Sequence, residues 1–336
     1  MTFRVTNSRA NELLIDRILG QQAKLEKIRE EVSSGIRVKN ASDNPSRASE
    51  VSRSKMAIER IDRHQERIAL GISMFEAQEV VLSSAQNALT RAKELATQGA
   101  NATTSAEQRE RMAEEVFSLR EQLVSLANST YRGRHLYGGV RDDEPPFALA
   151  AAPGYAEPAG GSGPEVERFV FSDLPGTEVS KTVHFGQGSS ERVSSSGREV
   201  FEKAIAGLEM LGRSLDGYSS TRDAQGLPDG GGAAFSLPEE LPAQIEEIRE
   251  AMQLVDAASK DDLGAELTSV GSRMERLMVA SETLDAVKLS EEAKRASLQD
   301  SDPFEAISTL GSLETGLQAL VSTGSKIGSM SLMNYL

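Results

Sequence analysis

The chain has 336 residues, no Cys, no Trp and only 4% aromatic residues, and its net charge is −14. The absence of Cys excludes disulfides, thiolate chemistry and Cys-based metal sites. Few large aromatics favour a core of Leu, Ile, Val, Met and Ala in narrow helical packing. The acidic balance argues against nucleic acid as a partner, because phosphate binding needs a basic surface.

The beginning of the chain offers no membrane or secretion signal. No apolar run approaches the roughly 18 residues of a membrane span, so we expect no membrane contact. The first 20 residues, MTFRVTNSRANELLIDRILG, lack an apolar h-region and a cleavage site, which predicts no cleavable secretory signal.

Two long helices are predicted in the first hundred residues. The first runs from about 7 to 32, and the second from about 46 to 98. Both carry apolar residues at the alternating 4/3 spacing of a heptad seam. The seam residues are Leu14, Ile18, Leu25, Ile28 and Val32 in the first helix, and Ile58, Ile61, Ile68, Ile72, Phe75, Leu82 and Leu89 in the second.

A third helix follows, and the chain then changes character. Ser105 and Gln108 form a capping-box pattern that opens this helix. Nine of the 11 prolines lie in residues 145–242, and 17 of the 28 glycines lie in 138–232, which breaks long helices there. VERFVF (166–171) and VSKTVHF (179–185) predict strands on either side of an LPG turn, and a helix is expected over about 198–216.

Helical periodicity resumes from about 242 to 298, with a possible break near 260–262, and a last helix starts cleanly. Asp302 suits the N-cap and Pro303 the first helical position. The last helix has apolar seam residues Leu310, Leu313, Leu317, Leu320 and Ile327. It also contains four glycines, each of which costs roughly 1 kcal/mol relative to Ala inside a helix. We therefore expect it to gain order by packing tightly against other subunits, although a frayed tail is the alternative.

These patterns predict a mainly α fold with a β-containing insert. Long antiparallel helices from the N- and C-terminal segments would form a coiled-coil rod, and a small middle domain would protrude. We expect three parts: terminal helices (1–45 and 302–336) for polymerisation, a long-helix rod (46–139 and 238–301), and a variable outer domain with strands (140–237). Residues 141–240 carry 8 Lys+Arg and 17 Asp+Glu, net −9, so most of the acidic excess falls on the outer domain.

A turn between the first two helices carries a family resemblance. In SSGIRVKNASDNP, Gly35 can supply a positive φ, Asn44 can cap, and Pro45 can start the next helix. This turn resembles the one that follows the first helix of bacterial flagellins and their relatives. The matching residues are Ser33, Ser34, Gly35, Ser42, Asp43, Asn44 and Pro45, with Asn44 standing where a second acidic residue is more usual.

Two further stretches narrow the resemblance to the hook–filament junction proteins, the FlgL family. LANSTYRGRHLYGG (126–139) is similar to the end of their third helix, through Ala127, Asn128, Gly133, Leu136, Tyr137 and Gly139. SLMNYL (331–336) resembles their C-terminus rather than a flagellin end. RAKELATQGAN (91–101) fits both families, and the middle of the chain matches nothing we can place.

The resemblance implies a structural subunit of the bacterial flagellum, without enzymatic activity or cofactor. It implies export through the flagellar type III channel to an extracellular position, helped by a chaperone on the C-terminal region. The implied partners are the junction protein FlgK on the hook side, flagellin on the filament side, and copies of the chain itself. The expected polymerisation residues are Leu14, Ile18, Leu25, Ile28, Val32, Leu310, Leu313, Leu317, Leu320, Ile327, Leu332 and Leu336.

Other functions have little support in the residues. His64, His135 and His184 are scattered without metal-ligand spacing, and no H-E-x-x-H, G-x-S-x-G or phosphate-loop motif occurs. The run Asp142–Glu144 could hold a cation, but a solvated acidic loop is the preferred interpretation. A short flagellin remains an alternative, and so do a secreted adhesin, an enzyme in the middle domain and a non-flagellar coiled-coil scaffold.

Overall fold

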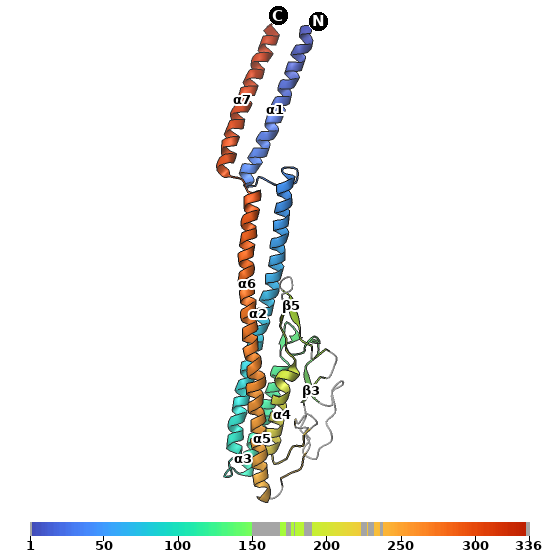
Figure 1. Ribbon diagram of the computed structural model, residues 1–336, viewed down its shortest axis with the longest axis vertical. Helices are drawn as coiled ribbons and strands as arrows, with labels where there is room; N and C mark the ends of the chain where they lie inside the picture. Colours follow the sequence, from blue (N-terminus) through green and yellow to red (C-terminus); the bar gives the residue numbers. More distant parts are fainter. Residues whose placement is uncertain are drawn as a thin grey trace. The chain divides into compact units, whose positions relative to one another are not determined.

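The computed structural model describes residues 2–149, 169–172, 176–177, 179–184, 190–222, 227, 232–235 and 238–333. Its α-helices are α1 (Thr2–Ser34), α2 (Pro45–Gly99), α3 (Ala106–Ala127), α4 (Gly197–Leu215), α5 (Leu241–Ala257), α6 (Gly264–Gln299) and α7 (Pro303–Met333). Its strands are β1 (Thr130–Tyr131), β2 (Arg134–His135), β3 (Phe147–Leu149), β4 (Phe169–Phe171), β5 (Thr182–His184) and β6 (Ser190–Arg192). Figure 1 confirms the predicted fold class, long helices from both ends of the chain with a strand-containing insert.

The chain forms two compact units. One comprises residues 1–62 and 284–336, here called the terminal unit, and the other comprises residues 63–283, here called the central unit. The borders fall inside α2 and α6, so each of these helices contributes to both units. The three-part division into polymerisation, rod and outer domains concerns roles in an assembly and stays a prediction.

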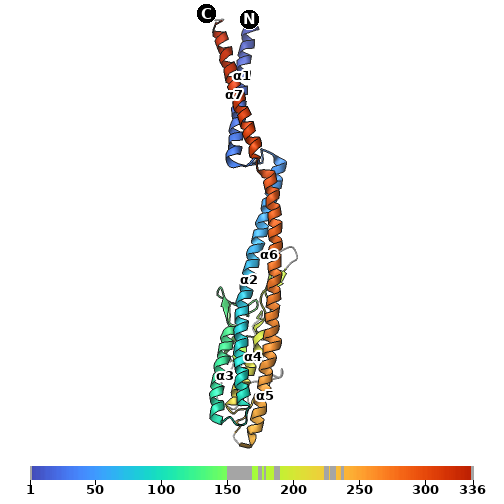
Figure 2. The ribbon, with the colours of Figure 1, turned by 90° about the vertical axis from the view of Figure 1, so that its left-hand side faces the viewer.

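The central unit has a dense apolar core. Ile68, Phe75, Leu82 and Leu89 lie seven residues apart on α2, and all four are fully buried. α4 packs against both α3 and α5, and Figure 2 shows these helices gathered around this part of α2. α3 and α4 come so close that a Cβ at Gly212 would lie 2.5 Å from the ring of Phe117. This unit therefore buries its heptad seam without help from another molecule.

A π-helical turn, η2 (Ala258–Leu263), joins α5 to α6 where the sequence suggested a break. The buried residues Ile248 and Val255 are seven positions apart, as are Leu263, Val270 and Leu277. Val255 and Leu263, however, are eight apart. The wider i→i+5 turn of a π-helix absorbs one extra residue, so the apolar stripe stays on the same side before and after it.

The strands form three separate antiparallel pairs. β1 pairs with β2, β3 with β4, and β5 with β6. The two predicted strands are both found in part, as β4 and β5, but each pairs with another strand rather than with the other, and residues 166–168 and 185 lie outside the described residues. Because isolated two-stranded ribbons are marginal in water, these pairs need anchors. Phe147 and Phe171 stack edge-to-face at 5.4 Å, and a Cβ at Gly197, the first residue of α4, would lie 3.1 and 3.3 Å from their rings.

Polar contacts fix the β5–β6 pair to the helices. Arg276 of α6 donates two hydrogen bonds to the carboxylate of Glu191, at 3.0 and 2.8 Å. Gln78 of α2 donates to the carbonyl oxygen of Val193 at 2.8 Å, and Ser195 donates to the buried carboxylate of Glu266 at 2.6 Å. The insert is therefore held by directed contacts as well as by its aromatic side chains.

Among the described residues, α2 is the one helix whose length and composition would allow it to cross a membrane. Part of that stretch is buried by the protein itself, and the core helix of a folded domain passes the same test. This finding is weak support for membrane contact.

Candidate assembly surface of the terminal helices

Within the terminal unit, α1 and α7 lie side by side, in line with the predicted packing of helices from the N- and C-terminal segments. Arg29 of α1 donates to Glu314 of α7 at 3.0 Å. A Cβ at Gly316 would lie 3.1 Å from the side-chain amide nitrogen of Gln21, and one at Gly324 would lie 3.0 Å from a methyl group of Leu14. These two glycines therefore allow the helices to approach closely. This close approach explains why they occur inside α7, although glycine lowers the stability of a helix.

The seam predicted from the heptad spacing faces this contact but is only partly covered. Leu25 is buried, Val32 is 36% exposed, and the others with described side chains are half-buried: Leu14, Ile18, Ile28, Leu310, Leu313, Leu317 and Leu320. Ile327 and Leu332 belong to α7, but their side chains lie outside the description, and Leu336 lies outside the described residues. Each helix thus uses this seam first against its partner in the same chain.

A second set of apolar side chains, which the heptad analysis missed, is open to solvent. Phe304 is 87% exposed and Ile307 is 57% exposed at the start of α7. The other members of this exposed apolar set on α1 and α7 are Leu13, Ile15, Leu19 and Val321. A helix turns about 100° per residue, so Ile15 and Leu19 lie well to the side of Leu14 and Ile18. The dense apolar run LLIDRIL was the available sign of a second face.

The family turn motif is a small hydrogen-bonded structure. Gly35 has a φ of 69°, as its role in the turn predicted. Asp43 accepts from the backbone N–H groups of Lys39 and Asn40 at 3.2 and 2.9 Å, and from the ammonium of Lys27 at 2.8 Å. These hydrogen bonds, that from Lys27 above all, lower the pKa of Asp43, so its carboxylate stays ionised and keeps the turn closed.

The same motif caps α2. The side chain of Asn44 accepts from the backbone N–H of Arg47 at 3.1 Å, and Pro45 is the first residue of the helix. Ser34 donates to the carbonyl oxygen of Glu30 at 2.7 Å, which closes the end of α1. Ser33 and Ser42 lie in the motif with exposed side chains.

The turn is also tied to the start of α7. The backbone N–H of Arg37 donates to the carbonyl oxygen of Gln299, and that of Ser301 to Gly35, at 2.8 and 2.9 Å. The Asp302 carboxylate accepts from the N–H groups of Phe304 and Glu305 at 2.9 and 3.3 Å, which confirms the predicted N-cap. These contacts fix where α1 ends and α7 begins, and so they fix the starting point of the exposed apolar set.

Within the described part of the chain, no group of three His, Asp or Glu side chains is placed to hold a metal ion. One expectation about the acidic run 142–144 was wrong. Asp142 is buried rather than solvated, because Arg134 and Lys181 both pair with its carboxylate. A buried carboxylate loses its contacts with water, and the two cations compensate for that loss.

Comparisons with known proteins agree with this architecture. Residues 6–142 match the family described as the bacterial flagellin N-terminal helical region. Flagellar hook-associated protein 3 of Salmonella typhimurium is 25% identical over 98% of this chain and 98% of its own length. The protein of the same name from Escherichia coli K12 is 31% identical over 39% of this chain and 42% of its own length.

Two solved structures share the fold. A flagellar hook-associated protein 3 from Legionella pneumophila has a TM-score of 0.56 at 16% identity, over 74% of this chain and 98% of its own. A Vibrio parahaemolyticus protein assigned as flagellar hook-associated has a TM-score of 0.59 at 18% identity, over 77% of this chain and all of its own.

Long helices from both ends of the chain, the capped turn between α1 and α2, and the family match define a flagellin-like structural protein. The N-terminal part of the chain, residues 6–142, matches the bacterial flagellin N-terminal helical region, and along almost its full length the chain is similar to flagellar hook-associated protein 3, also called FlgL. The predicted function, a structural protein of the hook–filament junction, is confirmed at that level.

Proposed function

We propose that the chain joins the hook side of the flagellum to the flagellin filament by packing α1 and α7 against neighbouring subunits. The observation that carries this proposal is the exposed apolar set on these two helices, which includes Phe304 and Ile307 at the start of α7. Full burial of such a side chain contributes about 1.5–3 kcal/mol. The predicted polymerisation seam would close further in the same contact.

The proposed neighbours are copies of the chain itself, the junction protein FlgK on the hook side and flagellin on the filament side. We further propose that the chain leaves the cell through the flagellar export channel, and that a chaperone binds the C-terminal region beforehand. The partly covered helices support this route, because a partner could hold their apolar side chains until assembly. We propose no enzymatic activity and no cofactor.

The test is to place a charge on the exposed set and leave the fold intact. In a flagellated strain that carries this chain as its only junction protein of this type, we expect Ile307→Asp to abolish motility and filament attachment. Ser308→Asp is the matched control, because Ser308 is an exposed polar neighbour on the same helix. Deletion of residues 307–336 should act like Ile307→Asp and leave the central unit folded.

Purified protein separates the junction role from a short flagellin. A flagellin should polymerise alone into long filaments, whereas we expect this chain to add to hook-side or filament ends. Motile cells with Ile307→Asp, or long filaments formed by the purified chain alone, would overturn the proposal.

A further inference from the structure

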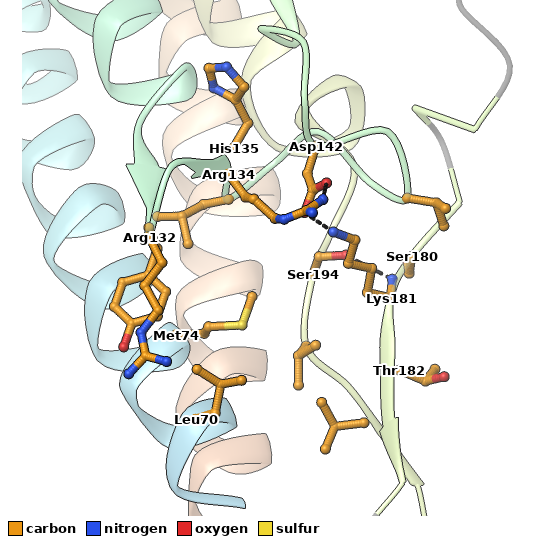
Figure 3. A pocket seen from close by; sticks show the side chains of 15 residues that line it. Leu70, Met74, Arg132, Arg134, His135, Asp142, Ser180, Lys181, Thr182 and Ser194 are labelled. Atoms are coloured by element: carbon orange, nitrogen blue, oxygen red, sulfur yellow. Dashed lines mark hydrogen bonds and ion pairs between the residues drawn. The ribbon is translucent and has the colours of Figure 1, made fainter. Parts of the chain in front are cut away.

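The central unit contains a pocket of about 580 Å³ between α2, the β1–β2 hairpin, β5 and the segment that follows β6. Figure 3 shows Leu70 and Met74 of α2 on one side of it and β5, which carries Thr182, on the other. Val183 and Val193 add to this apolar lining. Pockets of roughly 300–1,000 Å³ with apolar walls and a few polar groups are typical of small-molecule sites.

The lining of this pocket has more positively than negatively charged side chains. The lining contains three cationic side chains, Arg132, Arg134 and Lys181, and one carboxylate, Asp142. Asp142 is already paired with two of them, with Arg134 at 2.7 Å and with Lys181. The guanidinium of Arg132 instead stacks on the ring of Tyr131, 5.5 Å from its centroid. The pocket therefore carries an excess of positive charge in a chain of net charge −14.

Arg132 is held there by an unfavourable backbone conformation. It is the only non-glycine residue with a positive φ, 52°, in the described part of the chain, and it precedes Gly133, whose φ is 77°. Tyr131 pairs with Arg134, so Arg132 and Gly133 between them form a two-residue hairpin loop. Loops of this kind prefer Asn-Gly or Gly-Gly. Such strain clusters at ligand sites, and here it presents a long cationic side chain beside an apolar wall.

We propose that this pocket binds a small amphipathic anion, an aliphatic chain that ends in a carboxylate. The aliphatic part would pack on Leu70 and Met74, and the carboxylate would lie between Arg132 and the Arg134–Lys181 pair. Burial and the nearby charge of Arg134 lower the pKa of Lys181, so an added anion relieves crowding between like charges. A neutral ligand leaves that imbalance in place, and a cationic ligand increases it.

The test uses the full chain and two probes that differ only in their head group. Decanoate, below its micelle-forming concentration, is titrated by calorimetry, and decan-1-ol is the uncharged counterpart. We expect decanoate to bind at least about tenfold more tightly, because hydrogen bonds to a charged group are roughly twice as strong as neutral ones. Methyl-labelled methionine reports the place of binding, and the Met74 signal should shift while that of Met56, in the terminal unit, should not.

Arg132→Gly removes the guanidinium and suits the positive φ, so the variant should fold at least as well as the parent chain. We expect it to weaken decanoate binding by about tenfold, and Arg132→Lys, which keeps the charge, to restore most of the affinity. Equal binding of decan-1-ol, an unchanged affinity of Arg132→Gly, no decanoate binding, or a shift at methionines other than Met74 would each overturn the proposal.

Discussion

The two units of this chain use the same heptad spacing with different results. In the central unit, the seam residues Ile68 and Phe75 of α2 are fully buried among several helices. In the terminal unit, Leu14 and Ile18 of α1 face α7 and remain half-buried. The spacing determines which face of a helix is apolar, whereas the number of neighbours determines how much of that face is covered. The terminal unit is therefore the part that still has free energy to gain from another subunit.

The largest expected effect is on the central unit. Ile68→Asp places an unpaired charge in a fully buried position, which should cost about 3–5 kcal/mol. The melting temperature should fall by roughly 10 °C or more. Ala69→Asp, at the adjacent exposed position, is the control and should melt close to the parent chain. Similar melting temperatures for both variants would mean that Ile68 is not buried in the core of the central unit.

Leu317→Asp makes the same change in the half-buried seam of α7. Water can reach part of this side chain, so we expect a loss of about 1–2 kcal/mol, within the common range for single substitutions. Assembly should nevertheless be lost, because the charge lies beside the proposed interface. Thermal melting and electron microscopy of isolated hook–filament junctions would measure the two effects. A larger loss of stability than for Ile68→Asp would reverse the comparison.

Acid should weaken the attachment of the β5–β6 pair to α6. Hydrogen bonds from Arg276 lower the pKa of Glu191, so the folded carboxylate titrates below its unfolded value of about 4.3. The pair therefore stabilises the fold above that pH and is lost as the pH falls through the folded pKa. Glu191→Gln should lower stability by up to about 1 kcal/mol at pH 7 and have a smaller effect at pH 3. The exposed Glu199→Gln should not change this pH dependence.

The smallest effect distinguishes two glycines of α7. No atom beyond its own helix lies within 4 Å of a Cβ placed at Gly311, whereas one at Gly324 would lie 3.0 Å from Leu14. Gly311→Ala should therefore gain about 1 kcal/mol in helix stability, and Gly324→Ala should gain less or lose. Helicity by circular dichroism during thermal melting would measure this difference. Equal gains would mean that α1 and α7 do not pack closely in solution.

Local signals in the sequence predicted local structure well. Asn44–Pro45, Ser105–Gln108 and Asp302–Pro303 are short-range capping patterns, and all three start helices where expected. The eight-residue step from Val255 to Leu263 was also visible in the sequence, and it marks η2.

Features that depend on distant partners could not be predicted in this way. The exposure of Leu19 and Ile307 depends on how much of each helix its neighbour covers. The burial of Asp142 depends on Lys181, 39 residues away. The pocket likewise combines α2, a hairpin and β5, and no single stretch of sequence carries its pattern.

The π-helical turn between α5 and α6 has a consequence for how this chain tolerates changes in length. One surplus residue is confined to η2, so Val270 and Leu277 keep their buried positions in α6. Without this turn, the surplus would rotate every later side chain of the helix by about 100°. A local irregularity thus acts as a buffer, and removing one residue there should be better tolerated than removing one from the regular helix on either side.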